Sequence, residues 1–510
     1  MLISTIQGSS AAIAPGMNLD FKSQAQSSRE LRVSDCVHLR RNEQAESGER
    51  IHSGMAERGR LMHVIVVGGG LVGSTLAAKL AGDGHDVVLV ERSSELIADL
   101  NERLDVQTIC GNGATIPVLM KAGIENADLL LATTDSDEAN MVVALVGSVI
   151  FKVPKVAARL RDPEHEEGFR RIAREPGEER VAINPDMAAV EKILSLLPVP
   201  GAVDVVSFFD GKLLVAGFHI KPGSEFAGLL LSHLRLLFPA TPMLVVAIRR
   251  DGRWRVPYGD DEIRAGDLVY FAMDPSELDN VLVLLGLHRG AERRVMIAGA
   301  TRIGVNLARR LEDDGVPVTL VDDRRPACDK AAAELDDTLV IHGSPTDREL
   351  LREEGAERVE GFIACTDRHE ENVVACLLAG RMGAAHTFAL VDNSALSGLV
   401  GDLGIDAIIS PRLLSVSLAL HFARKGRIRS VAALLEDSVE VFEVEAVEDS
   451  RLVCSPLSEL GLPRGILMVA VQRDDRIFIP GGDDSIQPGD QVIVTTTAEM
   501  ASKLDDVLEA

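Results

Sequence analysis

The chain is predicted to be an α/β protein with two doubly wound parallel sheets, each followed by a small α+β module. From residue 62 onward, short runs of Val, Ile and Leu alternate with helical stretches, which is typical of a parallel sheet covered by helices on both faces. A glycine fingerprint follows the first apolar run, and a close copy recurs about 230 residues later. Each of these units leads into short strands separated by turns, so the whole plan is repeated.

The elements of the first repeat follow from the spacing of its apolar residues. A helix is expected at 71–81 because Val72, Leu76 and Leu80 recur at helical spacing. The other expected helices are 95–103, 115–123, 138–151 and 187–197, and the expected strands are 64–67, 86–90, 106–110, 127–133 and 155–160. In the first small module, strands are expected at 203–208, 212–219, 244–249 and 267–271, with turns such as Asp210-Gly211 between them.

This periodicity divides the chain into five segments. We expect nucleotide-binding domains at 62–200 and 292–428, and small modules at 201–288 and 429–510. The segment 1–61 is rich in Ser, Gln, Arg and Glu, and no helical or strand period continues through it. We expect it to be a disordered extension, or to stem from a misassigned start ahead of Met62.

Composition and charge exclude several classes of function. A formal net charge of −25 disfavours nucleic acid, since phosphates would be repelled, and 14 Phe, 1 Trp and 2 Tyr leave few rings to stack on bases. The longest apolar runs fall short of the ~18 residues that indicate a membrane span. The six cysteines are scattered without a metal-binding spacing, which favours reduced thiols in a cytosolic protein and no metal site.

The first fingerprint carries every part of a dinucleotide-binding motif. Gly68 permits the tight turn from strand to helix, Gly70 lets the backbone approach a pyrophosphate, and Gly73 allows helix and strand to pack closely. Glu91 ends the second strand, where a carboxylate can accept hydrogen bonds from the adenosine ribose, which favours NAD(H) over NADP(H). The loop and the first helical turn, whose N–H groups face the phosphates, supply the candidate cofactor-binding residues Gly68, Gly69, Gly70, Leu71, Val72 and Gly73.

The second fingerprint departs from this pattern. Thr301 stands where the middle glycine belongs, and its branched side chain is expected to crowd a pyrophosphate. Asp322 still supplies the ribose acceptor. The corresponding candidate residues are Gly299, Ala300, Thr301, Arg302, Ile303 and Gly304. Two interpretations stay open, a weaker nucleotide site or a purely structural repeat.

Catalytic groups are missing around these motifs. A hydride-transfer enzyme needs a substrate domain and a placed acid or base, and no such constellation is visible, so we expect no enzyme. An NAD-dependent oxidoreductase is the alternative. Paired aspartates in each module, at 260–261 and 483–484, are expected to serve turns rather than to bind a cation.

Several motifs resemble the RCK (KTN) family, whose members regulate Trk-type potassium uptake systems. The resemblance covers residues 62 to about 507 and is carried by Met-His-Val-Ile-Val-Val-Gly-Gly-Gly from Met62, and by the segments 132–140, 158–163 and 409–412. It implies two RCK_N nucleotide domains, each followed by an RCK_C module. It also implies further cofactor contacts at Thr134, Asp135 and Arg159, and at Thr366 and Asp367 in the second copy. Leu390 falls where the second copy would need an arginine, so this site is expected to bind more weakly.

The family resemblance implies a sensor. Such a protein binds NAD(H), with ATP or ADP as a further ligand class left open, and transmits the change to a membrane-embedded Trk-type potassium transporter subunit. It implies a homotetramer in the cytoplasm, held at the inner face of the membrane by that partner. A regulator of a potassium efflux system or channel is the remaining alternative.

Overall fold

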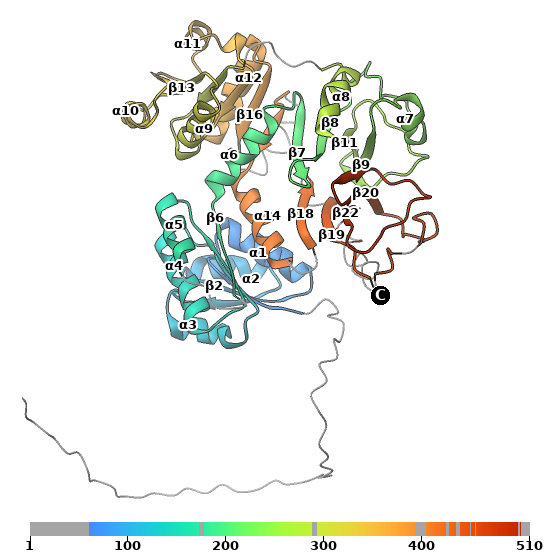
Figure 1. Cartoon of the computed structure of the whole chain (residues 1–510). Helices are drawn as coiled ribbons and strands as arrows, with labels where there is room; N and C mark the ends of the chain where they lie inside the picture. The colour runs from blue at the N-terminus through green and yellow to red at the C-terminus, as the bar shows by residue number, and fades with distance from the viewer. Residues whose placement is uncertain are drawn as a thin grey trace, which may run out of the picture. The chain divides into compact units, whose positions relative to one another are not determined.

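A computed structural model describes residues 61–172, 178–287, 293–392, 404–424, 428–434, 439–448, 450–453, 455–497 and 500, and the side chains of 424 and 428–434 are not included in that description. The expectation for 1–61 therefore lies outside the described residues, apart from Leu61. Four sheets alternate along the chain in the order parallel, antiparallel, parallel, antiparallel (Figure 1). The predicted fold class is confirmed. The domain boundaries given above remain predictions.

The first parallel sheet has the strand order β3-β2-β1-β4-β5-β6 that is typical of dinucleotide-binding folds. Its strands are β1 (His63–Val67), β2 (Asp86–Glu91), β3 (Gln107–Cys110), β4 (Leu129–Ala132), β5 (Lys155–Arg159) and β6 (Glu179–Ile183). Its helices are α1 (Leu71–Gly82), α2 (Ser94–Arg103), α3 (Ile116–Lys121), α4 (Asp137–Leu145), α5 (Pro163–Arg171) and α6 (Pro185–Leu196), and α4 continues as a π-helical turn at Val146–Ile150. Apart from His63, the residues of the central strands β1 and β4 are buried, as expected for a sheet covered on both faces.

The second parallel sheet repeats this order as β14-β13-β12-β15-β16-β17. Its strands are β12 (Val295–Ala298), β13 (Val318–Asp322), β14 (Leu339–His342), β15 (Gly361–Ala364), β16 (His386–Leu390) and β17 (Ala407–Ile409). Its helices are α9 (Arg302–Asp313), α10 (Arg325–Glu334), α11 (Arg348–Glu353), α12 (His369–Met382) and α14 (Pro411–Arg424). The switch of direction between β1 and β4, and between β12 and β15, places a ligand crevice at the carboxyl edge of each sheet.

Both small modules contain a five-stranded antiparallel sheet, and the two strand orders match. The first is β10-β9-β11-β8-β7, and the second is β18-β19-β22-β20-β21. The elements of the first are β7 (Ala202–Phe208), β8 (Leu213–His219), α7 (Leu231–Leu237), β9 (Met243–Arg250), β10 (Arg253–Arg255), β11 (Leu268–Met273) and α8 (Leu278–Leu285). The strands of the second are β18 (Ile428–Leu434), β19 (Val439–Glu445), β20 (Ile466–Arg473), β21 (Arg476–Phe478) and β22 (Gln491–Thr497).

The two nucleotide-fold repeats exchange their last helices. Helix α14 belongs to the second repeat, yet Val416 and Ala419 pack with Val72 and Leu76 of α1 in the core of the first repeat (Figure 1). Helix α6 belongs to the first repeat and packs against α9 of the second. Each repeat therefore covers one face of the other, and residues near the start of α6 and of α14 lie close to the partner repeat.

Candidate functional site

The first glycine loop connects β1 to α1 at the carboxyl edge of the first sheet. Gly68 has φ +108°, and a Cβ atom there would lie 2.8 Å from the backbone nitrogen of Thr134. A Cβ on Gly73 would lie 1.9 Å from the carbonyl oxygen of Gly68. A Cβ on Gly70, by contrast, would meet no atom within 4 Å. The fold itself needs the outer two glycines, whereas Gly70 only keeps the space in front of the loop open.

The start of α1 is free of side-chain caps. Gly70 is the N-cap residue, and among the described residues no side chain caps the first turn. The N–H groups of Leu71, Val72 and Gly73 therefore keep their donors, and the positive end of the helix dipole points at the crevice. An uncapped helix start behind a glycine loop is the usual phosphate-binding arrangement.

Glu91 lies at the end of β2, beside the same loop. Its Oε2 accepts a hydrogen bond from the backbone N–H of Gly69 at 2.7 Å, and its Oε1 accepts from the N–H groups of Arg92 at 2.7 Å and Ser93 at 2.8 Å. A carboxylate offers about four acceptor positions, so one on Oε2 remains for a ligand hydroxyl. The predicted ribose acceptor is thus held in place by its own loop.

A buried asparagine fixes the far side of the crevice. Asn140 Oδ1 accepts from the backbone nitrogen and the hydroxyl of Thr134 at 2.9 and 2.7 Å, and its Nδ2 donates to the carbonyl oxygens of Thr134 at 3.0 Å and Arg159 at 2.8 Å. One fully buried amide therefore ties the end of β4 to the end of β5. Nothing in the sequence indicated this bridging role of Asn140.

Arg159, the last residue of β5, carries a guanidinium with unused donors. Its side chain is 12% exposed and lies 3.6 Å from a carboxylate oxygen of the fully exposed Asp135. Its Nε atom is shielded from solvent and has no hydrogen-bond partner in the described part of the chain. Burial, and then repulsion from Arg161, lowers the pKa of Arg159. A buried cation whose charge is poorly neutralised favours an anion as its partner.

The second glycine loop keeps the same backbone but closes its helix start. Gly299 has φ +120°, and a Cβ on Gly304 would lie 2.0 Å from the carbonyl oxygen of Gly299. Thr301 is the N-cap residue of α9, and its Oγ1 accepts from the N–H of Gly304 at 3.3 Å and donates to the carbonyl of Cys365 at 2.9 Å. The substitution that was expected to crowd a pyrophosphate also occupies one of the donors that would bind it.

The ribose position of the second site is filled by an arginine. Asp322 accepts hydrogen bonds from the N–H groups of Ala300 and Arg324, and from Nε and Nη2 of the Arg324 side chain at 3.0 and 2.9 Å. These four bonds saturate the carboxylate. The same guanidinium donates to Asp367 through Nη1 at 3.0 Å. Burial would raise the pKa of Asp322, but the hydrogen bonds from Arg324 outweigh it and leave that pKa lowered.

Of the remaining predicted residues of the second site, some are arranged as in the first site and others are not. Asn372 bridges Thr366 to the carbonyl of Leu390 at 2.9 Å, as Asn140 does in the first repeat. Leu390 ends β16 and is buried, so the second site lacks the cation that Arg159 gives the first. Arg302, the first residue of α9, forms an ion pair at 3.0 Å with Asp186 of α6 instead of facing its own loop.

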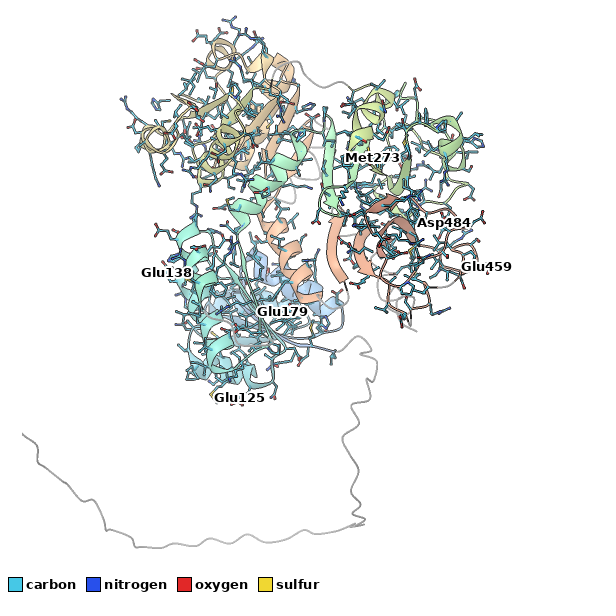
Figure 2. The ribbon with its side chains drawn as sticks, in the orientation of Figure 1. Glu125, Glu138, Glu179, Met273, Glu459 and Asp484 are labelled. Atoms are coloured by element: carbon cyan, nitrogen blue, oxygen red, sulfur yellow. The ribbon has the colours of Figure 1, made fainter. Side chains whose placement is uncertain are left out.

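The aspartate pairs of the small modules serve turns. Asp484, labelled in Figure 2, accepts from the N–H of Gly481 at 2.7 Å, and Asp261 accepts from the N–H of Tyr258 at 2.8 Å. Among the described residues, no group of three or more His, Cys, Asp or Glu side chains is arranged to hold a metal ion. No helix in the described ranges is long and apolar enough to cross a membrane.

Two open-sheet domains with glycine-loop sites and two small modules are also found in known proteins. The TrkA-N domain family matches residues 64–175 and 295–411, and the TrkA-C domain family matches 215–286 and 441–509. The Trk system potassium uptake protein TrkA of Azorhizobium caulinodans is 34% identical over 450 residues, which cover 88% of this chain and 98% of that protein. The same protein of Halomonas elongata is 33% identical over 436 residues, 85% of this chain and 95% of that protein. The chain therefore belongs to the TrkA family of Trk potassium uptake proteins, as the motifs had predicted.

Solved structures of lower identity share the fold. The crystal structure of the GsuK RCK domain matches with a TM-score of 0.55 and 21% identity over 88% of this chain and 95% of that chain. A structure of the GsuK channel bound to NAD matches with a TM-score of 0.54 and 21% identity, and covers 88% of this chain and 79% of that chain. At this identity the likeness concerns the fold alone.

Proposed function

We propose that the chain is the nucleotide-binding regulatory subunit of a potassium uptake system, and that NAD(H) binds in the first repeat. The observation that carries the proposal is the contrast in hydrogen bonding between the two sites. The first has an uncapped helix start, an acceptor position on Glu91 and an unpartnered Nε on Arg159. The second has Thr301 on its helix start and Arg324 on its acidic residue. Only the first leaves its polar groups for a ligand.

Calorimetric titration of the full-length chain with NADH tests this assignment. We expect one tight site per chain, with NADPH weaker because a 2′-phosphate would approach the Glu91 carboxylate. Glu91→Arg should abolish the preference for NADH, whereas Asp322→Arg, the matched change in the second repeat, should leave the tight site unchanged. NADPH that binds as tightly as NADH would contradict the proposal.

Regulation requires that the ligand favours one arrangement of the domains, because equal affinity for both arrangements shifts nothing. We propose that a homotetramer in the cytoplasm, held at the membrane by its potassium-transporting partner, provides this coupling, and that ATP or ADP competes for the same site. A deletion strain should then take up potassium poorly at low external potassium. Sensitivity to high external potassium would instead favour a regulator of efflux.

An NAD-dependent oxidoreductase is the alternative from a different class. It predicts steady oxidation of NADH with a small-molecule substrate at about one turnover per second or more. We propose no enzyme, because Thr134 and Asp135 of the crevice are engaged by Asn140 and Arg159, and the sequence shows no acid–base constellation around the motifs. Steady turnover together with normal potassium uptake in the deletion strain would overturn the proposal.

A further inference from the structure

Helix α14 of the second repeat packs along α1 and against β5 and β6 of the first repeat. Its C-terminal end is fixed at the amino edge of the first sheet, because Lys155 Nζ, at the start of β5, donates to the carbonyl of Ala423 at 3.3 Å. At 1.5 Å per residue, Arg412 stands about 16 Å along the helix from that point. Arg159 stands about 13 Å along β5 from Lys155. These lengths allow the first turn of α14 to reach the carboxyl edge of the sheet, where β5 ends.

The other exchanged helix gives an independent measure of the same geometry. At the start of α6, Asp186 contacts Arg302, the first residue of α9, at 3.0 Å. Asn184-Pro185-Asp186 opens α6 just as Ser410-Pro411-Arg412 opens α14, so Arg412 is the counterpart of Asp186. Because α14 packs on α1 as α6 packs on α9, Arg412 belongs beside the first residue of α1, next to the uncapped helix start.

The Arg412 side chain has a hydrogen-bond donor without a partner among the described residues. Its Nε atom is shielded from solvent and lacks a hydrogen-bond partner within the described ranges, as does Nε of Arg159. This correspondence would set two arginines, each with an Nε that lacks a partner within the described ranges, beside a helix start without a side-chain cap. The counterpart of Arg412 in the first repeat is a carboxylate, Asp186, which pairs with Arg302 and also interacts electrostatically with Arg159.

We propose that Arg412 of the second repeat completes the phosphate-binding end of the first site. The ligand class is an adenine nucleotide with at least two phosphates, bound by the first turn of α1, Arg159 and Arg412 together. The inference rests on the proposed nucleotide function and adds that the site is shared between the repeats. A bound pyrophosphate then links α1 of one repeat to α14 of the other. Departure of the ligand removes the anion that both arginines would share at that junction.

The test follows NADH fluorescence on titration into the full-length chain, for the natural sequence, Arg412→Gln, Arg412→Lys and Arg381→Gln. Arg381 is an exposed residue of α12 in the same repeat, so its replacement removes one positive charge elsewhere. Displacement of NADH by adenosine, which lacks phosphate, is measured in parallel. Thermal melting of each variant shows whether the fold is kept.

Arg412→Gln should weaken NADH binding about tenfold, as expected for loss of one charged hydrogen-bonding partner. Arg412→Lys should bind NADH more tightly than Arg412→Gln but more weakly than the natural chain. Lysine keeps the positive charge but lacks the planar guanidinium that can donate two parallel hydrogen bonds. The affinity for adenosine and the Arg381→Gln variant should be unchanged. Unchanged NADH affinity in Arg412→Gln would overturn the inference alone. Equal losses for NADH and adenosine would also overturn it, since the side chain would then support the fold rather than the phosphates. A natural chain that binds no NADH would overturn both proposals.

Discussion

Opening the second site is the sharpest test of why only one repeat is expected to bind the dinucleotide. Arg324 places three side-chain hydrogen bonds on Asp322 and Asp367, and Thr301 places one on the start of α9. The double variant Thr301→Gly/Arg324→Ala removes both of these side chains from the second site. It leaves the cradle of Gly299 and Gly304 intact, so the backbone of the site should not change.

The expected gain in NADH affinity follows from the hydrogen-bond acceptor positions that the double variant frees on Asp322. Removal of the guanidinium frees one position on each carboxylate oxygen of Asp322. A hydrogen bond to a charged group contributes about 1.5–3 kcal/mol, and about 1.4 kcal/mol corresponds to a tenfold change in affinity. One restored ribose contact should therefore tighten NADH binding at the second site by at least about tenfold. The variant should also lose about 1–2 kcal/mol of stability, a modest cost because Arg324 is 47% exposed.

Calorimetric stoichiometry provides the assay. The natural chain should bind one tight NADH, and the double variant should approach two. Each single variant should give a stoichiometry between these two values, because each frees only the start of α9 or only the Asp322 carboxylate. Arg325→Ala is the matched control, because Arg325 is the exposed neighbour of Arg324 at the start of α10. Two tight sites in the natural chain, or no second site in the double variant, would refute the reasoning.

Other consequences follow from the loop and the small modules. Gly70→Val should abolish NADH binding with little change in melting temperature, whereas Gly73→Val should destabilise the fold by roughly 3 kcal/mol or more, because its Cβ would meet a backbone oxygen at 1.9 Å; equal melting temperatures would contradict this contrast. Burial would raise the pKa of Asp267, but hydrogen bonds from Arg250 outweigh it and leave that pKa lowered. Its folded-state pKa is therefore below the unfolded value of about 3.9, so its stabilisation is present above about pH 4 and is lost as the pH falls further. Arg250→Met should make denaturant unfolding less dependent on pH in that acid range, and an unchanged pH profile would speak against the pair.

Local features of the sites could be predicted from the sequence. Gly68 and Gly73 stand where strand meets helix, and their need for bare backbone follows from the turn alone. The fold class could be predicted because the spacing of apolar residues along each helix and strand matches the face that the element buries. The sixth strand of the first sheet, β6 (Glu179–Ile183), was missed, because a short edge strand with charged residues lacks the apolar run that marks a central one.

Side-chain contacts at a distance could not be predicted. Arg324 follows Asp322 closely in the sequence, but only its rotamer determines whether the guanidinium bonds to that carboxylate or points outward. The ion pair of Arg302 with Asp186 depends on the helix exchange, and a repeat visible in the sequence does not say which repeat each terminal helix covers. The weakness of the second site was expected from Thr301 and Leu390, and this remains a prediction.

The exchange of α6 and α14 also determines whether the two halves of the chain can be stable as separate polypeptides. Val416 and Ala419 fill the core beside α1, and Ile193 and Leu196 fill the core that contains α9, so neither half of the chain encloses a complete apolar interior by itself. A chain divided between the first small module and β12 would expose both faces at once. The two halves should therefore melt in a single transition and, if made as separate polypeptides, should stay soluble only when produced together.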